Sequence, residues 1–214
     1  MTFLAKSTSS AQLQIKPPSH MPAPLRIAFF GGTFDPIHEG HLELAQKAIH
    51  KLKLDRILFI PCRRSPHKTE APGASDNERL EMLKLATASF SWAKIENYEL
   101  NKPPPSYTWE TVQHFKETLD PKTQLLLLIG FDQWHALPRW SNVETLAKLV
   151  EFIVVGRGQQ PEARKGYTAH FIQGDHPASS SQIRSALKNG LAPRWLPPAV
   201  EDYLVKKGLY SIIP

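Results

Sequence analysis

Cysteine is almost absent from this chain of 214 residues, which contains Cys62 alone. A single cysteine excludes an intrachain disulfide framework and any zinc or iron–sulfur site built from several cysteines, and it favours a reducing, cytoplasmic compartment. Long apolar runs are missing as well. The longest covers residues 125–129, far short of the ~20 residues of a membrane span, so we expect a buried strand there and no membrane partner.

Acidic residues are missing from the N-terminal end of the chain, where the first one is Asp35. Residues 1–24 contain serines, glutamines and four prolines without hydrophobic periodicity, which predicts a disordered leader before a folded domain at 25–214. Met21 stands just before the first predicted strand and is an alternative start of translation. The chain has 26 Lys and Arg against 20 Asp and Glu, and this net charge of +6 favours anionic partners.

Strand-like and helix-like segments alternate along the rest of the chain. In the full sequence 41% of the residues are hydrophobic and 21% are charged. Strands are predicted at 25–30, 56–60, 93–99, 123–129, 151–155 and 169–172. Helices are predicted at 39–52, 76–88, 109–119, 143–148, 181–188 and 198–206. This order indicates a single α/β domain with a doubly wound parallel sheet and a ligand site outside the carboxyl ends of its strands.

A glycine turn with two histidines joins the first predicted strand to the first helix. Gly31 and Gly32 let the backbone approach a ligand, and the helix that follows offers unpaired N–H groups to a phosphate. His38 and His41 are three residues apart and so project to the same side of the helix start. Two imidazoles there can donate hydrogen bonds to phosphate oxygens whose negative charge grows in a transition state.

Plainer interpretations of this turn remain open. A strand, two glycines and a helix occur in many α/β proteins, and the spacing here matches neither the dinucleotide fingerprint nor the Walker loop. The two histidines could also bind a metal ion. No carboxylate or third histidine completes an obvious ligand set, so we expect no protein ligands to a metal.

The stretch from Gly31 to Leu42 reads Gly-Gly-Thr-Phe-Asp-Pro-Ile-His-Glu-Gly-His-Leu. It resembles the signature of nucleotidyltransferases that carry a His-x-Gly-His motif, and specifically the bacterial nicotinate-nucleotide adenylyltransferases, with the resemblance extending over residues 26–210. The resemblance implies a Rossmann-like fold and transfer of adenylate from ATP to nicotinic acid mononucleotide. The products would be deamido-NAD and pyrophosphate, with Mg²⁺ accompanying ATP.

The resemblance also implies site residues in the glycine turn. In the family both motif histidines contact ATP phosphates, and this catalytic role falls on His38 and His41. The turn backbone lies along the nucleotide in the family, which extends the ATP site to Gly31, Gly32, Thr33 and Phe34.

A second phosphate-binding element is indicated at residues 179–184, which read Ser-Ser-Ser-Gln-Ile-Arg. Serines before a helix usually serve as caps. The segment is also similar to the family's Ile-Ser-Ser-Thr-x-Ile-Arg motif, which implies that Ser180 and Arg184 bind ATP phosphates. Ala178 and Ser181 replace the usual isoleucine and threonine, a difference expected to affect local packing more than phosphate binding.

Further resemblances imply a site for the mononucleotide. They fall in the segments 62–68 and 106–108 and at Trp140. Each has a plain alternative, which is a solvated basic loop for the first, a helix cap for the second and core packing for the tryptophan. Cys62 carries no signal of an activated thiol, and Trp92, Trp109, Trp134 and Trp195 are assigned to core packing. The residues carried over to the mononucleotide site are Lys68, Tyr107, Thr108, Asp132 and Trp140.

Two other functions compete with this interpretation. One is another adenylyltransferase of the same superfamily, acting on the amidated mononucleotide or on phosphopantetheine. The other is a non-catalytic nucleic-acid-binding module, suggested only by the positive charge. The basic residues lack an interleaved aromatic platform or a known binding motif, so we expect no nucleic-acid partner. A class I aminoacyl-tRNA synthetase is excluded, because the chain is too short and has no Lys-Met-Ser-Lys-Ser loop.

Overall fold

Six parallel strands form one sheet in a computed structural model, which describes residues 23–64, 71–156 and 160–210. The order across the sheet is β3-β2-β1-β4-β5-β6. The strands are β1 (Arg26–Gly32), β2 (Arg56–Pro61), β3 (Ala93–Ile95), β4 (Gln124–Gly130), β5 (Glu151–Gly156) and β6 (Ala169–Gln173). Apolar side chains fill the central strands on both faces, as expected of a sheet that is covered on both sides.

The strand order reverses between β1 and β4. From β1 the chain adds β2 and β3 on one side, then crosses back to place β4 on the other side of β1. In register, Phe29 of β1 lies opposite Leu127 of β4. A doubly wound sheet opens a crevice outside the carboxyl ends of the strands at such a switch point, so the sequence-based prediction of the fold class is confirmed and the site is placed by topology.

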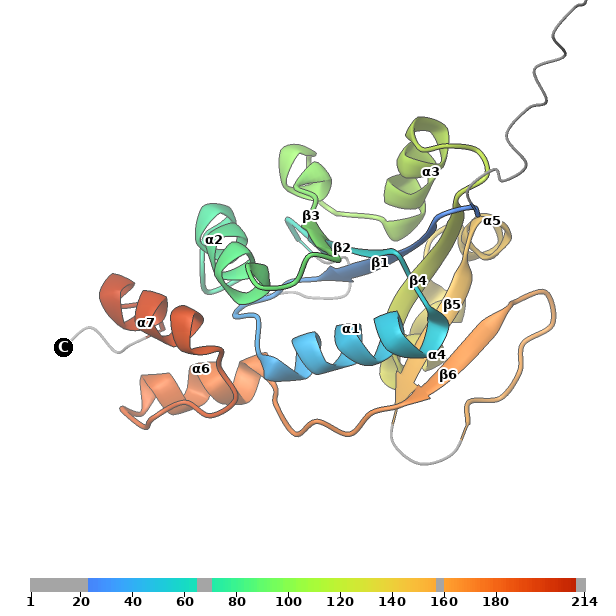
Figure 1. Cartoon of the computed structure of the whole chain (residues 1–214). Coiled ribbons are helices and arrows are strands. Elements are labelled where there is room, and N and C mark those ends of the chain that lie inside the picture. Colours follow the sequence, from blue (N-terminus) through green and yellow to red (C-terminus); the bar gives the residue numbers. More distant parts are fainter. Residues whose placement is uncertain (1–22, 65–70, 157–159, 211–214) are drawn as a thin grey trace, which may run out of the picture.

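Helices cover both faces of the sheet, as Figure 1 shows with α1 on one side and α3 on the other. The helical elements are α1 (Glu39–Leu52), α2 (Asp76–Thr87), η1 (Tyr98–Asn101), α3 (Thr108–Thr118), α4 (Phe131–Ala136), η2 (Leu137–Arg139), α5 (Val143–Leu149), α6 (Ser180–Lys188) and α7 (Pro198–Lys207). Alternate residues of β1 enter two separate cores. Ala28 and Phe30 pack with residues of α1, α2, α6 and α7, whereas Ile27 and Phe29 pack with residues of α3, α4 and α5.

The first helix begins and ends where the sequence predicts. His38 precedes α1 with an extended backbone, and Lys53 closes the helix in the left-handed conformation at φ 50°. Leu42, Ala45 and Ile49 are buried on one face, which is the spacing of an amphipathic helix. Apart from the strand described next, the other predicted elements agree with the structure to within one or two residues at each end.

Two local predictions are corrected. The strand expected over 93–99 ends at Ile95, because the chain turns into η1 and buries the Glu99 side chain. The short helix α4 and the turn η2 had not been predicted between the fourth strand and α5. Six residues without a capping side chain give no periodic signal, yet α4 buries Trp134 in the core.

Several sequence-based predictions lie outside the described residues. These are the prediction that the leader is disordered, apart from residues 23 and 24, the alternative start at Met21, and Lys68 with most of its basic loop. Within the described part of the chain, no helix is long and apolar enough to cross a membrane.

Candidate active site

A cavity of about 680 Å³ opens at the carboxyl ends of β1 and β4. This size is typical of sites for small-molecule ligands. Its wall combines the end of β1, the end of β4, the start of α3 and the segment that follows α4. The cavity therefore lies at the switch point of the sheet, where the order of the elements predicted a ligand.

His41 lines this cavity, and His38 lies beside it with only 7% of its surface exposed. The two rings stack with their centroids 3.7 Å apart. The backbone N–H of His38 donates to Nδ1 of His41 over 3.3 Å. Because Nδ1 accepts this bond, Nε2 carries the proton of the neutral ring, and His41 can donate from Nε2 to an anion.

His38 is held in its neutral form by its surroundings. Burial, with a further contribution from the nearby His176, lowers the pKa of His38 from 6.5 to about 4. Gly40 permits this packing, since a Cβ there would lie 3.1 Å from Nδ1 of both His38 and His176. The two motif histidines thus differ in their surroundings. His41 lines the cavity, whereas His38 is buried beside it and neutral.

The glycine turn presents backbone to the cavity. Gly31 is exposed and has open space around the position of a Cβ, while Gly32 packs against the ring of Phe34. Thr33 lines the cavity with both glycines. Phe34 adopts φ 49°, is 2% exposed and belongs to the core, and it is not among the residues that line the cavity.

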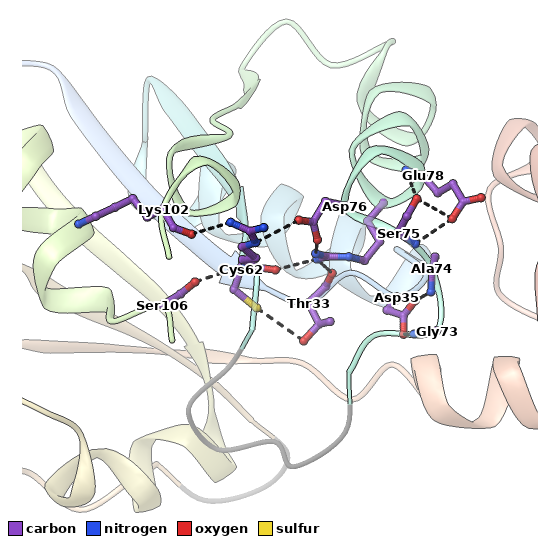
Figure 2. Close-up of polar contacts among 12 residues, drawn as sticks. Thr33, Asp35, Cys62, Gly73, Ala74, Ser75, Asp76, Glu78, Lys102 and Ser106 are labelled. Atoms are coloured by element: carbon purple, nitrogen blue, oxygen red, sulfur yellow. Dashed lines mark hydrogen bonds and ion pairs between the residues drawn. The ribbon is translucent and has the colours of Figure 1, made fainter. Parts of the chain in front are cut away.

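The carboxylate of Asp35 connects this turn to distant parts of the chain. It accepts hydrogen bonds from the backbone N–H groups of Gly73 and Ala74 at 2.8 and 3.0 Å and from the Tyr210 hydroxyl at 2.7 Å (Figure 2 for Gly73 and Ala74). Arg184 lies 3.6 Å from the same carboxylate and donates to the Asp35 carbonyl at 2.6 Å. No local sequence signal marks this role of Asp35, because it depends on residues far apart in the chain.

Ser180 and Arg184 are brought to the glycine turn but do not line the cavity. The Ser180 hydroxyl donates to the Pro36 carbonyl over 2.9 Å, and Arg184 binds Asp35 as described above. In this structure both side chains therefore bind other groups of the protein, which for Arg184 include the Ser181 hydroxyl at 3.4 Å. Their predicted contact with ATP phosphates remains a prediction.

The predicted mononucleotide residues are only partly brought together. Tyr107, Thr108 and Trp140 line the cavity. Asp132 is exposed near the start of α4 and is not among the lining residues of the described chain. Lys68, as noted, lies outside the described residues.

Several lining residues had not been singled out by sequence. Glu99 is 7% exposed, accepts a hydrogen bond from the Thr111 hydroxyl at 2.7 Å, and has its pKa raised by burial. Gln133 and Arg139 come from the unpredicted helical segment after β4. No sequence signal marks these residues, because their place in the site depends on the turn at η1 and on α4.

The tryptophans and the cysteine divide between core and cavity. Trp134 is 2% exposed and belongs to the core, as predicted, but Trp195 is 41% exposed, so its assignment to the core was wrong. Trp109 lines the cavity while also packing against the core. Cys62 lines the cavity too, and its thiol contacts the Thr33 hydroxyl with 3.8 Å between sulfur and oxygen.

A metal site formed by the protein alone is not found among the residues described. No group of three or more histidine, cysteine, aspartate or glutamate side chains is arranged to hold an ion there.

The parallel sheet, the glycine turn and a histidine facing a cavity at the switch point together define a nucleotidyltransferase. The sequence model of the family described as cytidylyltransferase-like matches residues 29–186. The chain belongs to this family.

Similar proteins carry a more specific name. A probable nicotinate-nucleotide adenylyltransferase from Methylacidiphilum infernorum is 39% identical over 188 residues, which cover 86% of this chain and 92% of the relative. One from Bacillus licheniformis is 38% identical and covers 87% of this chain and 98% of the relative. The nicotinic acid mononucleotide adenylyltransferase of Plasmodium falciparum, solved with NaAD, shares the fold with a TM-score of 0.70 at 23% identity, covering 87% and 97% of the two chains.

Proposed function

We infer that this protein is a nicotinate-nucleotide adenylyltransferase, which transfers AMP from ATP to nicotinic acid mononucleotide and releases pyrophosphate. The observation that carries this conclusion is the agreement in name among relatives 38–39% identical over most of the chain. The cavity supports it, because a nucleotidyltransferase needs one site that holds two nucleotides side by side. The single cysteine, a buried thiol, accords with a reducing cytosol as the compartment.

We propose a direct in-line reaction. A phosphate oxygen of the mononucleotide attacks the α-phosphorus of ATP, and the bond from that phosphorus to the bridging oxygen of the β-phosphate breaks. Pyrophosphate leaves with the electron pair of this bond. The attacking phosphate is already ionised near neutral pH, so no general base is needed, and the protein contributes positioning and charge stabilisation.

His41 is the residue best placed to stabilise the reacting phosphates. Its Nε2 carries the proton because Nδ1 accepts the N–H of His38. The N-terminus of α1 beside it adds a partial positive charge, although the backbone N–H groups of Glu39 and His41 already donate to the carbonyls of Trp195 and His38. Mg²⁺ enters with ATP as part of the substrate complex, held by phosphate oxygens and water. Ser180 and Arg184 would complete the ATP site by exchanging their present protein contacts for phosphate oxygens.

The mononucleotide is proposed to occupy the opposite wall of the cavity. Trp140 offers an aromatic face for the pyridine ring, and Tyr107 and Thr108 offer backbone amides at the start of α3 for the nicotinate carboxylate. Lys68 is proposed to bind a phosphate and Asp132 a ribose. Each of these roles rests on the family resemblance, and Trp140, Tyr107 and Thr108 have support from their position in the cavity wall.

Pyrophosphate release tests the proposed function. The purified chain would be incubated with MgATP and, in turn, nicotinic acid mononucleotide, the amidated mononucleotide and phosphopantetheine. We expect release with the first and much slower release with the other two. Preferential use of another acceptor would transfer the activity to the corresponding adenylyltransferase. Absence of release with every acceptor would contradict an enzymatic role and favour the nucleic-acid-binding module.

A further inference from the structure

The carboxylate of Asp76, at the start of α2, lies between two guanidinium groups (Figure 2). Its Oδ1 is 2.6 Å from Nη2 of Arg79, and its Oδ2 is 3.7 Å from Nε of Arg63. None of these three side chains is among the residues that line the cavity in the described chain. The structure connects them to the cavity through the residues that they contact.

Arg79 connects the ends of two strands at the site. It is completely buried, and its Nη1 donates to the Thr33 carbonyl at 2.7 Å and to the Cys62 carbonyl at 2.8 Å. Thr33 follows β1, Cys62 follows β2, and both line the cavity. A buried guanidinium needs a nearby anion, and Asp76 supplies one.

Arg63 connects the segment 102–106, on the proposed mononucleotide side of the cavity, to the end of β2. Its backbone N–H donates to the Ser106 hydroxyl at 3.3 Å, and its Nη1 donates to the Lys102 carbonyl at 3.2 Å. The Ser106 N–H in turn donates to the Arg64 carbonyl at 3.1 Å. These bonds hold the segment 102–106, which leads directly into the cavity residues Tyr107 and Thr108.

We propose that Arg63 and Asp76 are positioning residues that hold the mononucleotide wall in register with the ATP-binding turn. The path runs from the Thr33 carbonyl through the side chains of Arg79, Asp76 and Arg63 to the Lys102 carbonyl. This inference rests on the proposed function, since it assigns Ser106–Thr108 to the mononucleotide and the Thr33 turn to ATP. In-line transfer requires both reactants in one alignment, and small displacements of a wall reduce its rate.

The two ends of the path respond differently when Arg63 is removed. The ATP turn remains bound to Arg79, whereas segment 102–106 loses the bond from the Arg63 guanidinium. The Arg63 side chain is 47% exposed, and ion pairs at such positions add little to stability. Loss of the side chain should therefore change substrate binding on one side without changing the melting temperature.

The experiment compares Arg63→Met, Arg63→Lys, Asp76→Asn and the double variant Arg63→Met/Asp76→Asn with the wild-type chain. Matched controls are Glu81→Gln and Lys84→Met, which break an exposed ion pair of 3.2 Å on the same helix. Pyrophosphate release gives KM for each substrate. Hydrogen–deuterium exchange of the free protein reports on the segment 102–108 without requiring activity, through the backbone amides of Lys102, Ser106, Tyr107 and Thr108, because residues 103–105 are prolines.

Arg63→Met should raise KM for the mononucleotide about two- to fivefold, the range expected from an exposed pair, and leave KM for ATP and the melting temperature unchanged. Exchange at 102–108 should become faster. Arg63→Lys restores the charge but not the guanidinium fork, so its effect should be smaller. In the double variant the two effects should be less than additive, as for residues that act through one contact.

Exchange at 102–108 equal to wild type in Arg63→Met overturns the proposal, whatever the kinetic constants are. Equal increases in KM for both substrates together with a lower melting temperature also overturn it, because they indicate a general structural defect. Similar effects in the two control variants do the same. Failure of the proposed function is a separate result, seen as no pyrophosphate release by the wild-type chain, and in that case the exchange measurement alone decides whether the path holds the wall.

Discussion

The hydroxyl of Tyr210 donates to Oδ1 of Asp35 over 2.7 Å, joining residues 175 positions apart. Asp35 belongs to the glycine turn, and Tyr210 follows α7 near the end of the described chain. Burial and the neighbouring Asp35 raise the pKa of the Tyr210 hydroxyl, so it remains a donor at every physiological pH. This hydrogen bond connects the segment after α7 to the turn that leads into the motif histidines.

Replacing Tyr210 by phenylalanine should destabilise the protein without changing its shape. The variant removes one donor from a buried carboxylate, which costs about 1–2 kcal/mol and lowers the melting temperature by about 2–8 °C in a domain of this size. Thermal unfolding measures the shift. The control is Tyr203→Phe on α7, whose hydroxyl has no hydrogen bond recorded within the described chain. Equal melting temperatures for Tyr210→Phe and wild type would show that the bond contributes nothing.

Removal of the His41 imidazole should reduce turnover while the fold persists. His41→Ala removes the donor that we propose for the phosphates, and the loss of one such donor typically lowers kcat by about 10²–10³. Steady-state pyrophosphate release gives kcat, and circular dichroism checks the fold. His50→Ala serves as the control, because His50 lies on the same helix and is exposed. Near-normal turnover in His41→Ala would contradict the assigned role.

The buried His38 predicts a pH dependence of stability. Its pKa is about 4 in the folded protein and 6.5 in a model peptide, so between these values the unfolded chain binds the proton more readily. Stability is therefore complete above about pH 6.5 and is lost as the pH falls towards 4, by up to about 3 kcal/mol.

Urea unfolding at pH 7 and pH 4.5 measures this loss. His38→Gln should lose about 2–3 kcal/mol less than wild type between the two pH values, because the titrating ring is gone. His50→Gln should keep the dependence of the wild-type chain. The same slope in His38→Gln and wild type would rule out His38 as the source.

The parts of the fold that follow from local sequence could be predicted, and those that depend on distant contacts could not. Helix α1 was predicted over 39–52, its observed range, because its apolar spacing and the glycine turn before it are local signals. The end of β3 could not be predicted. It is set by the burial of Glu99 against Thr111 of α3, a partner 12 residues further along the chain.

The same distinction applies to the site. Gly31, Gly32, Thr33 and His41 come from one continuous motif, and the structure places them in the cavity wall. Arg79 gave no signal, since a lone arginine on a polar helix start is usually solvated. Its carbonyl partners lie 46 and 17 residues earlier in the chain, and only the pairing of β1 with β2 brings them together.

Gly31 allows ATP binding to be tested apart from stability. A Cβ at this position would meet no atom within 4 Å, so Gly31→Ala fits the free protein and should leave the melting temperature equal or slightly higher, through reduced freedom of the unfolded chain. The added methyl group would occupy space where the nucleotide is proposed to lie. We expect KM for ATP to rise about tenfold, the effect of ~1.4 kcal/mol of lost contact.

Gly166→Ala is the opposite control. Gly166 is exposed with φ +85°, where alanine is strained, so stability should fall while KM for ATP stays constant. An unchanged KM for ATP in Gly31→Ala would place the nucleotide away from the end of β1.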